Sequence, residues 1–69
     1  MTLDQYRKHL GWSWNRLAQE ARLDKATVQR ASRGDPIRGD TATQLARAIS
    51  EGLGYHVHFS DIDGLNVQL

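Results

Sequence analysis

The sequence contains no cysteine and only one proline in 69 residues. Without cysteine the chain has no disulfide, no thiolate nucleophile and no cysteine-ligated zinc site. The longest uncharged run, residues 52–60, is far shorter than the ~18 apolar residues of a membrane span. The first residues form neither a basic nor an apolar leader, so we expect a cytoplasmic protein. A chain this small needs close helix packing, a partner subunit or both to be stable.

Acidic residues are scarce in the first half of the chain and basic residues are scarce in the second. Residues 1–38 contain eight Lys and Arg against four Asp and Glu, whereas residues 39–69 contain one Arg against four acids. This asymmetry predicts a basic face directed at a polyanion. An ordinary solvated surface remains the alternative.

Hydrophobic periodicity and capping residues predict four helices. The expected helices cover residues 3–10, 14–21, 25–33 and 42–52. Their expected N-cap residues are Thr2, Ser13, Asp24 and Thr41, and two of these belong to capping boxes, Thr2 with Gln5 and Thr41 with Gln44. Gly11 is expected to end the first helix, and Gly34 is expected to end the third in a left-handed conformation. The fold class is therefore predicted as all-α, a compact domain of four to five helices.

The expected connection between the third and fourth helices is a loop over residues 34–40, because Pro36 cannot continue a helix. The last fifteen residues are ambiguous, since apolar and polar residues alternate over 55–59 and 65–69 as they do in strands. Ser60 and Asp63 also fit a capping box for a short fifth helix that ends at Gly64. We favour a helical turn followed by an extended or β tail.

The second and third helices are separated by a few residues, and the third presents a polar stripe. Ala26, Gln29, Arg30 and Arg33 share the face opposite the apolar Val28 and Ala31. Two short helices arranged in this way are the requirement for a helix-turn-helix that places its second helix in the major groove.

The segment of residues 13–34 resembles the lambda-repressor-like helix-turn-helix family, also called the Cro/C1 or XRE type. The positions similar to the family pattern are Leu17, Ala18, Ala21, Asp24, Val28 and Gly34. The chain departs from the pattern at Trp14, where many relatives have Gln, and at the small Ala31. It also has Arg22 where the turn usually has Gly, which predicts a different turn geometry or a strained left-handed residue. With its flanking helices the resemblance covers about residues 2–54, so we expect residues 1–54 to form the DNA-binding domain.

The resemblance and the chemistry of the grooves together predict the DNA contacts. The residues expected to contact bases are Lys25, Ala26, Thr27, Gln29 and Arg30. The residues expected to contact phosphates are Ser13, Trp14, Arg33 and Arg38. The alternative for these polar residues is a solvated helix face, and for Trp12 and Trp14 it is packing on the core.

The C-terminal segment, residues 55–69, is expected to hold a homodimer, because one motif of this size reads only a few base pairs. The expected interface residues are Tyr55, Val57, Phe59, Ile62, Leu65, Val67 and Leu69. The alternative is a tail that folds back on its own subunit.

The function implied by the resemblance is a compact transcriptional regulator, a Cro-like repressor of a phage or mobile element on an inverted-repeat operator. The alternatives are an antitoxin that binds a toxin, an excisionase-like architectural protein, and a helix-turn-helix scaffold for protein contacts. We expect no enzymatic activity, no metal and no cofactor, because His56 and His58 lack a third ligand and no nucleophile has a base beside it.

Overall fold

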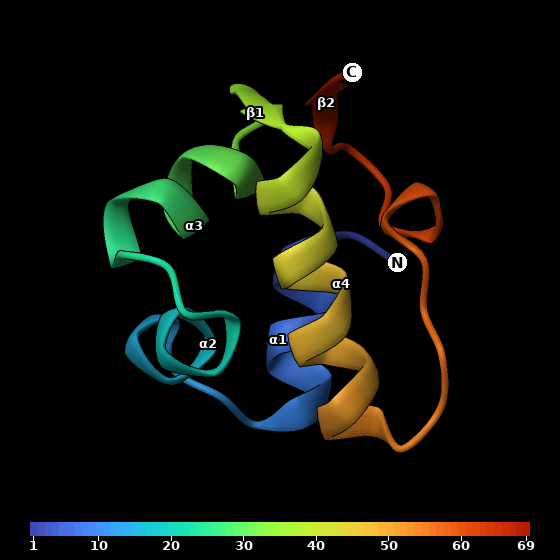
Figure 1. Cartoon of the computed structure of the whole chain (residues 1–69). Coiled ribbons are helices and arrows are strands. Elements are labelled where there is room, and N and C mark those ends of the chain that lie inside the picture. The colour runs from blue at the N-terminus through green and yellow to red at the C-terminus, as the bar shows by residue number, and fades with distance from the viewer.

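The computed structural model describes residues 1–69 and shows four α-helices, one 3-10 turn and two short strands (Figure 1). In chain order the elements are α1 (Leu3–Leu10), α2 (Trp14–Ala21), α3 (Lys25–Ser32), β1 (Pro36–Arg38), α4 (Gly39–Leu53), η1 (Phe59–Asp61) and β2 (Asn66–Gln68). The mostly helical prediction is confirmed, and a small sheet is added to it. No helix is both long enough and apolar enough to cross a lipid bilayer.

The first two helices begin at the residues that the sequence indicates. The Thr2 hydroxyl accepts a hydrogen bond from the backbone N–H of Gln5 at 3.2 Å, and the Gln5 side chain accepts one from the Thr2 N–H at 2.8 Å. Gly11 ends α1 at φ +72°, a conformation that glycine adopts without steric cost. The Ser13 hydroxyl then accepts from the Arg16 N–H at 3.0 Å and begins α2.

The core is built around α4, which packs against α1 and α2 (Figure 1). Every helix contributes at least one large side chain that is fully buried. These side chains are Leu3, Leu17, Val28, Leu45 and Ile49. The C-terminal segment runs along the side of α4 away from α2 and α3, so the helical core lies between the α2–α3 pair and this segment.

The Arg7 side chain of α1 packs against neighbouring residues and does not extend into solvent. It is only 16% exposed and donates hydrogen bonds to Asp4 and to the carbonyl oxygen of Trp12. The guanidinium also lies 4.4 Å from the ring centroid of Trp14. Both tryptophans are partly buried against the core, which confirms the packing interpretation of these residues.

The start of α4 also differs from the prediction. Residues 36–38 form a strand instead of part of a loop, and α4 begins at Gly39 with Arg38 as its N-cap. The predicted capping box at Thr41 does not form, because Thr41 lies inside the first turn of the helix. The reason is a long-range pairing of β1 that local sequence patterns do not contain.

The two strands form a parallel pair in which Ile37 lies opposite Val67. Parallel strands need a crossover connection, and α4 supplies most of it here. Ile37 is only 7% exposed, so the sheet covers one end of the core. The extended tail predicted for the end of the chain is confirmed by β2.

The helical turn predicted before this tail is also confirmed, but it begins earlier. It covers Phe59–Asp61 and is capped by His58 and Asp61, where the sequence suggested Ser60 and Asp63. The strand alternative for residues 55–59 is wrong, because the backbone there is irregular until the turn begins.

The C-terminal segment shares the core of the helical body. Val57 and Ile62 are 4% and 3% exposed. The Val57 N–H donates to the Ser50 hydroxyl of α4 at 2.8 Å, and the Asp63 N–H donates to the Met1 carbonyl at 2.9 Å. Residues 55–69 are thus tied to α4 and to the N-terminus of the same chain.

Candidate nucleic-acid interface

The turn between α2 and α3 consists of three residues, Arg22 to Asp24. Arg22 ends α2 in the left-handed region, with φ 58° and ψ 42°, and is the only residue other than glycine with a positive φ. The departure from the family pattern at this position is therefore accommodated by a strained arginine. Leu17 and Val28 have no exposed surface, so the two helices are packed tightly across the turn.

The outward face of α3 carries the predicted base-reading side chains. Val28 and Ala31 are buried, and the opposite face is open to solvent. Lys25, Ala26 and Arg30 are exposed, while Thr27 and Gln29 are partly exposed. The helix periodicity predicted for this segment is confirmed. The DNA contacts themselves remain predictions.

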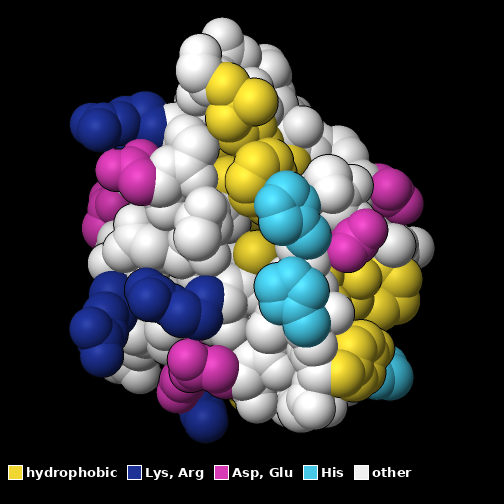
Figure 2. Space-filling view, turned by 45° about the vertical axis from the view of Figure 1, so that its right-hand side comes forward, with side chains coloured by type: hydrophobic (Ala, Val, Ile, Leu, Met, Phe, Trp, Pro, Cys, Tyr) yellow, Lys and Arg dark blue, Asp and Glu magenta, His cyan; other side chains and the backbone are white.

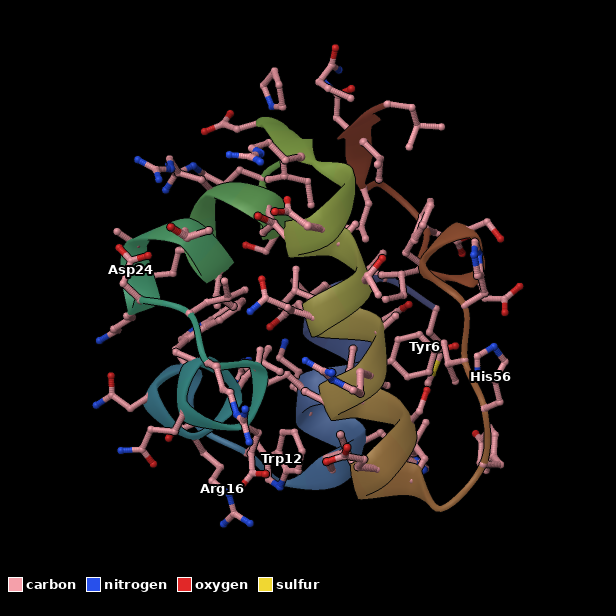
Figure 3. The ribbon with its side chains drawn as sticks, in the orientation of Figure 1. Tyr6, Trp12, Arg16, Asp24 and His56 are labelled. Carbon is pink, nitrogen blue, oxygen red and sulfur yellow. The ribbon has the colours of Figure 1, made fainter.

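Three polar side chains on this face are linked to one another. The Thr27 hydroxyl donates to a carboxylate oxygen of Asp24, and Arg30 Nη2 donates to the Thr27 hydroxyl at 3.2 Å. The bond from Thr27 is the main cause that lowers the pKa of Asp24 below its ordinary value, and nearby Arg30 also contributes. Asp24 begins α3 as predicted, but its side chain binds Thr27 and not the helix backbone. Figure 3 shows Asp24 at the outer edge of the molecule, where α3 begins.

A hollow of about 240 Å³ lies between α3, β1 and the first turn of α4. It is lined by Thr27, Arg30, Pro36, Ile37, Arg38 and Thr41. The structure therefore brings together a predicted base contact, Arg30, and a predicted phosphate contact, Arg38, although they lie on different elements. Thr41 was missed as a site residue because its sequence context resembled a helix cap.

Acidic side chains lie among the cations of this face. Arg33 pairs with Asp35, and Arg38 pairs with Asp40, each at 3.4 Å. These pairs are exposed, so each holds its arginine only weakly. They also reduce the positive field that would attract a polyanion, whereas Lys25 takes part in none of the ion pairs.

Ser13 and Trp14 lie at the start of α2 and do not line the hollow. The Ser13 oxygen accepts the cap bond from Arg16, which leaves its O–H able to donate to a phosphate. The Trp14 indole packs against the Arg7 guanidinium, so its ring is part of the packed interior and not directed at a phosphate. Of the two, Ser13 is the better placed for the predicted phosphate contact.

The seven residues predicted for a dimer interface divide into three groups. Val57 and Ile62 are buried in the core of their own chain and offer almost no surface to a partner. Phe59, Leu65 and Val67 are partly buried against the same core. Only Tyr55 and Leu69 are exposed, at 60% and 101%.

The histidines of this segment lie outside any cluster of metal-ligating side chains. No group of three His, Cys, Asp or Glu side chains is arranged to hold a metal ion. His58 accepts a hydrogen bond from the Ser60 N–H at 3.1 Å through Nδ1, and its ring lies 4.2 Å from that of Phe59. This histidine caps and packs the 3-10 turn.

Comparisons with protein-family models, with curated proteins and with solved structures found no significant match. The resemblance to helix-turn-helix proteins therefore stays a prediction from the residues of the chain.

Proposed function

We propose that the chain is a lambda-repressor-like helix-turn-helix protein that binds double-stranded DNA and regulates transcription as a homodimer on an inverted repeat. In this proposal α3 enters the major groove. Arg30 donates to the O6 and N7 atoms of a guanine, Gln29 pairs with an adenine edge, and Ala26 contacts a thymine methyl group. Lys25 and Thr27 complete the set at the start of the helix. Blocking of polymerase by the bound dimer is the simplest output.

The observation that carries this proposal is the outward face of α3. Buried Val28 and Ala31 fix the orientation of the helix, and its long polar side chains are left facing solvent. Arg38 lines the same hollow as Arg30, so a phosphate contact and a base contact are available from neighbouring positions. An α-helix that presents donors in this way fits the dimensions of the major groove.

Selection of duplexes from a random library, at near-physiological salt, tests the proposal. Such salt suppresses binding that depends only on phosphate contacts. We expect enrichment of an inverted repeat with half-sites about 10 bp apart, centre to centre. If no sequence is enriched and no duplex is bound, the proposal is wrong.

One observation favours a second candidate, a protein-interaction module of the antitoxin or scaffold kind. Asp24, Asp35 and Asp40 lie among the cations around α3 and offer a mixed-charge surface of the kind that proteins complement. Asp35→Asn separates the two candidates, because it frees Arg33. DNA affinity should rise if the face binds phosphates, whereas a partner protein that uses the carboxylate should bind more weakly.

A further inference from the structure

A groove of about 320 Å³ lies on the side of the molecule formed by α4 and the C-terminal segment. Its α4 wall is formed by Thr43, Ala46, Arg47, Ser50 and Glu51, and its other wall by residues 56–59. Figure 2 shows histidine and apolar side chains gathered along this face, with charged side chains beside them. None of the lining residues belongs to α3 or β1, so the groove is separate from the proposed DNA interface.

The two walls of the groove are fixed to each other. The Ser50 hydroxyl donates to the Ala46 carbonyl at 2.7 Å and accepts from the Val57 N–H at 2.8 Å. Ala46 and Val57 are 5% and 4% exposed and form an apolar floor, which partly buried Phe59 extends. The groove is therefore present before any partner arrives, and its formation costs no ordering of the chain on binding.

Two opposite charges at the rim of the groove have no partner within the chain. Arg47 and Glu51 are one helical turn apart, but neither takes part in any of the ion pairs or side-chain hydrogen bonds. Both charges are thus available to a partner, and the partner must present the opposite charges in the opposite order.

A second copy of this chain presents that order. When two α4 helices cross in antiparallel directions about a two-fold axis near Ser50, Arg47 of each copy faces Glu51 of the other. Ala46 and Ser50 lie against residues 56–59 of the same chain, so the exposed Thr43, Arg47 and Glu51 form the contact and not close packing of the two helices. Such an isologous contact covers both apolar floors and uses both unpaired charges.

We propose that the chain forms a two-fold dimer through the outer face of α4 and the groove beside it, with reciprocal ion pairs between Arg47 and Glu51. This inference rests on the proposed function only for the expectation that two recognition helices act together. It moves the interface from the apolar residues of the C-terminal segment to α4.

Two charge-reversal variants, Arg47→Glu and Glu51→Arg, test this interface. Arg47→Glu places two acidic side chains opposite each other at each rim contact, and Glu51→Arg places two arginines opposite each other. By sedimentation velocity over a wide range of concentration, the full chain should self-associate, and each variant should associate about tenfold more weakly or worse.

An equimolar mixture of the two variants should regain association. The Arg47→Glu copy then presents only acidic side chains at the rim, and the Glu51→Arg copy presents only arginines. Every rim contact between the two copies therefore joins opposite charges, which neither variant achieves alone.

The matched control is Lys25→Glu, which makes the same charge change on the face of α3. It should associate as the unchanged chain does while losing DNA binding, so a failure of the proposed function is distinguished from a failure of the dimer. Circular dichroism establishes that each variant is folded. A chain that stays monomeric at all concentrations, or a mixture that associates no better than its components, would overturn the proposed interface and leave the groove to a different protein.

Discussion

The two faces of the molecule hold their charged side chains in opposite ways. On the α3 face, Arg30, Arg33 and Arg38 each have a polar partner in the same chain. On the α4 face, Arg47 and Glu51 have none. The first face holds its arginines only weakly, and its acidic side chains lower the net positive field. The second retains its full charge for a partner, which is why it suits a protein contact of defined geometry.

Detaching the C-terminal segment from the α4 side of the core is expected to have the largest effect on stability. Ile62→Ala removes a side chain that is 3% exposed and holds the C-terminal segment against the core. We expect a loss of about 2–4 kcal/mol in the free energy of unfolding, measured by urea titration. Leu69→Ala, at a fully exposed position, is the matched control and should leave stability nearly unchanged. Equal effects of the two substitutions would contradict the buried role of the segment.

Removal of the Arg30 side chain should weaken DNA binding by α3 without changing the α4 face. Arg30→Ala should weaken binding to the selected duplex by about 1–3 kcal/mol and relax the preference at one base pair. Arg38→Ala is the comparison, because loss of a predicted phosphate contact should weaken binding to all duplexes similarly and lower its salt dependence. Binding titrations on matched and single-mismatch duplexes measure both. A uniform loss for Arg30→Ala would exclude its base-reading role.

A substitution in the turn between α2 and α3 is expected to raise the stability of the chain slightly. Arg22→Gly relieves a left-handed conformation, at φ 58°, that costs an arginine about 1–2 kcal/mol. Part of this gain is offset by the greater freedom of glycine in the unfolded chain. We expect thermal unfolding to show a net stabilisation of at most about 1 kcal/mol. Arg22→Val should destabilise the chain, since a β-branched side chain fits this region poorly.

Protonation of Asp24 in acid should lower the free energy of unfolding by a still smaller amount. The pKa of Asp24 is lowered in the folded chain by the Thr27 hydrogen bond, so folding favours the charged form. This contribution is complete above the ordinary pKa of 3.8 and disappears as the pH falls through the lowered pKa. Asp4, whose pKa Arg7 and Lys8 lower, behaves in the same way on α1. Asp24→Asn should therefore flatten the stability profile in acid, and an unchanged profile would contradict the role of the Thr27 bond.

The helices were predictable because their signals are local. Thr2, Ser13 and Gly11 act within a few residues of the helix ends that they define, and the buried face of α3 follows from the spacing of Val28 and Ala31. The left-handed Arg22 was one of two outcomes anticipated from the family pattern. These features depend on short stretches of chain, which periodicity and capping rules describe well.

The candidate sites were less predictable, because they depend on contacts between distant segments. The start of α4 depends on the pairing of β1 with β2, and the hollow at Arg30 and Arg38 depends on where that strand lies. The apolar residues of the C-terminal segment suggested a partner, although Val57 and Ile62 fill the core of their own chain. Their burial could not be predicted without knowing which side of α4 the other helices leave uncovered.

The parallel pairing of β1 and β2 has a consequence for the order of folding. The paired residues are separated by the whole of α4 and the 3-10 turn, so this contact closes a long stretch of chain. Contacts of large sequence separation form late, because their loop-closure entropy must first be met. Arg38 would then take its final position after the four helices have assembled. A protease that removed residues 66–69 from the folded chain would release Arg38 while α2 and α3 stayed in place.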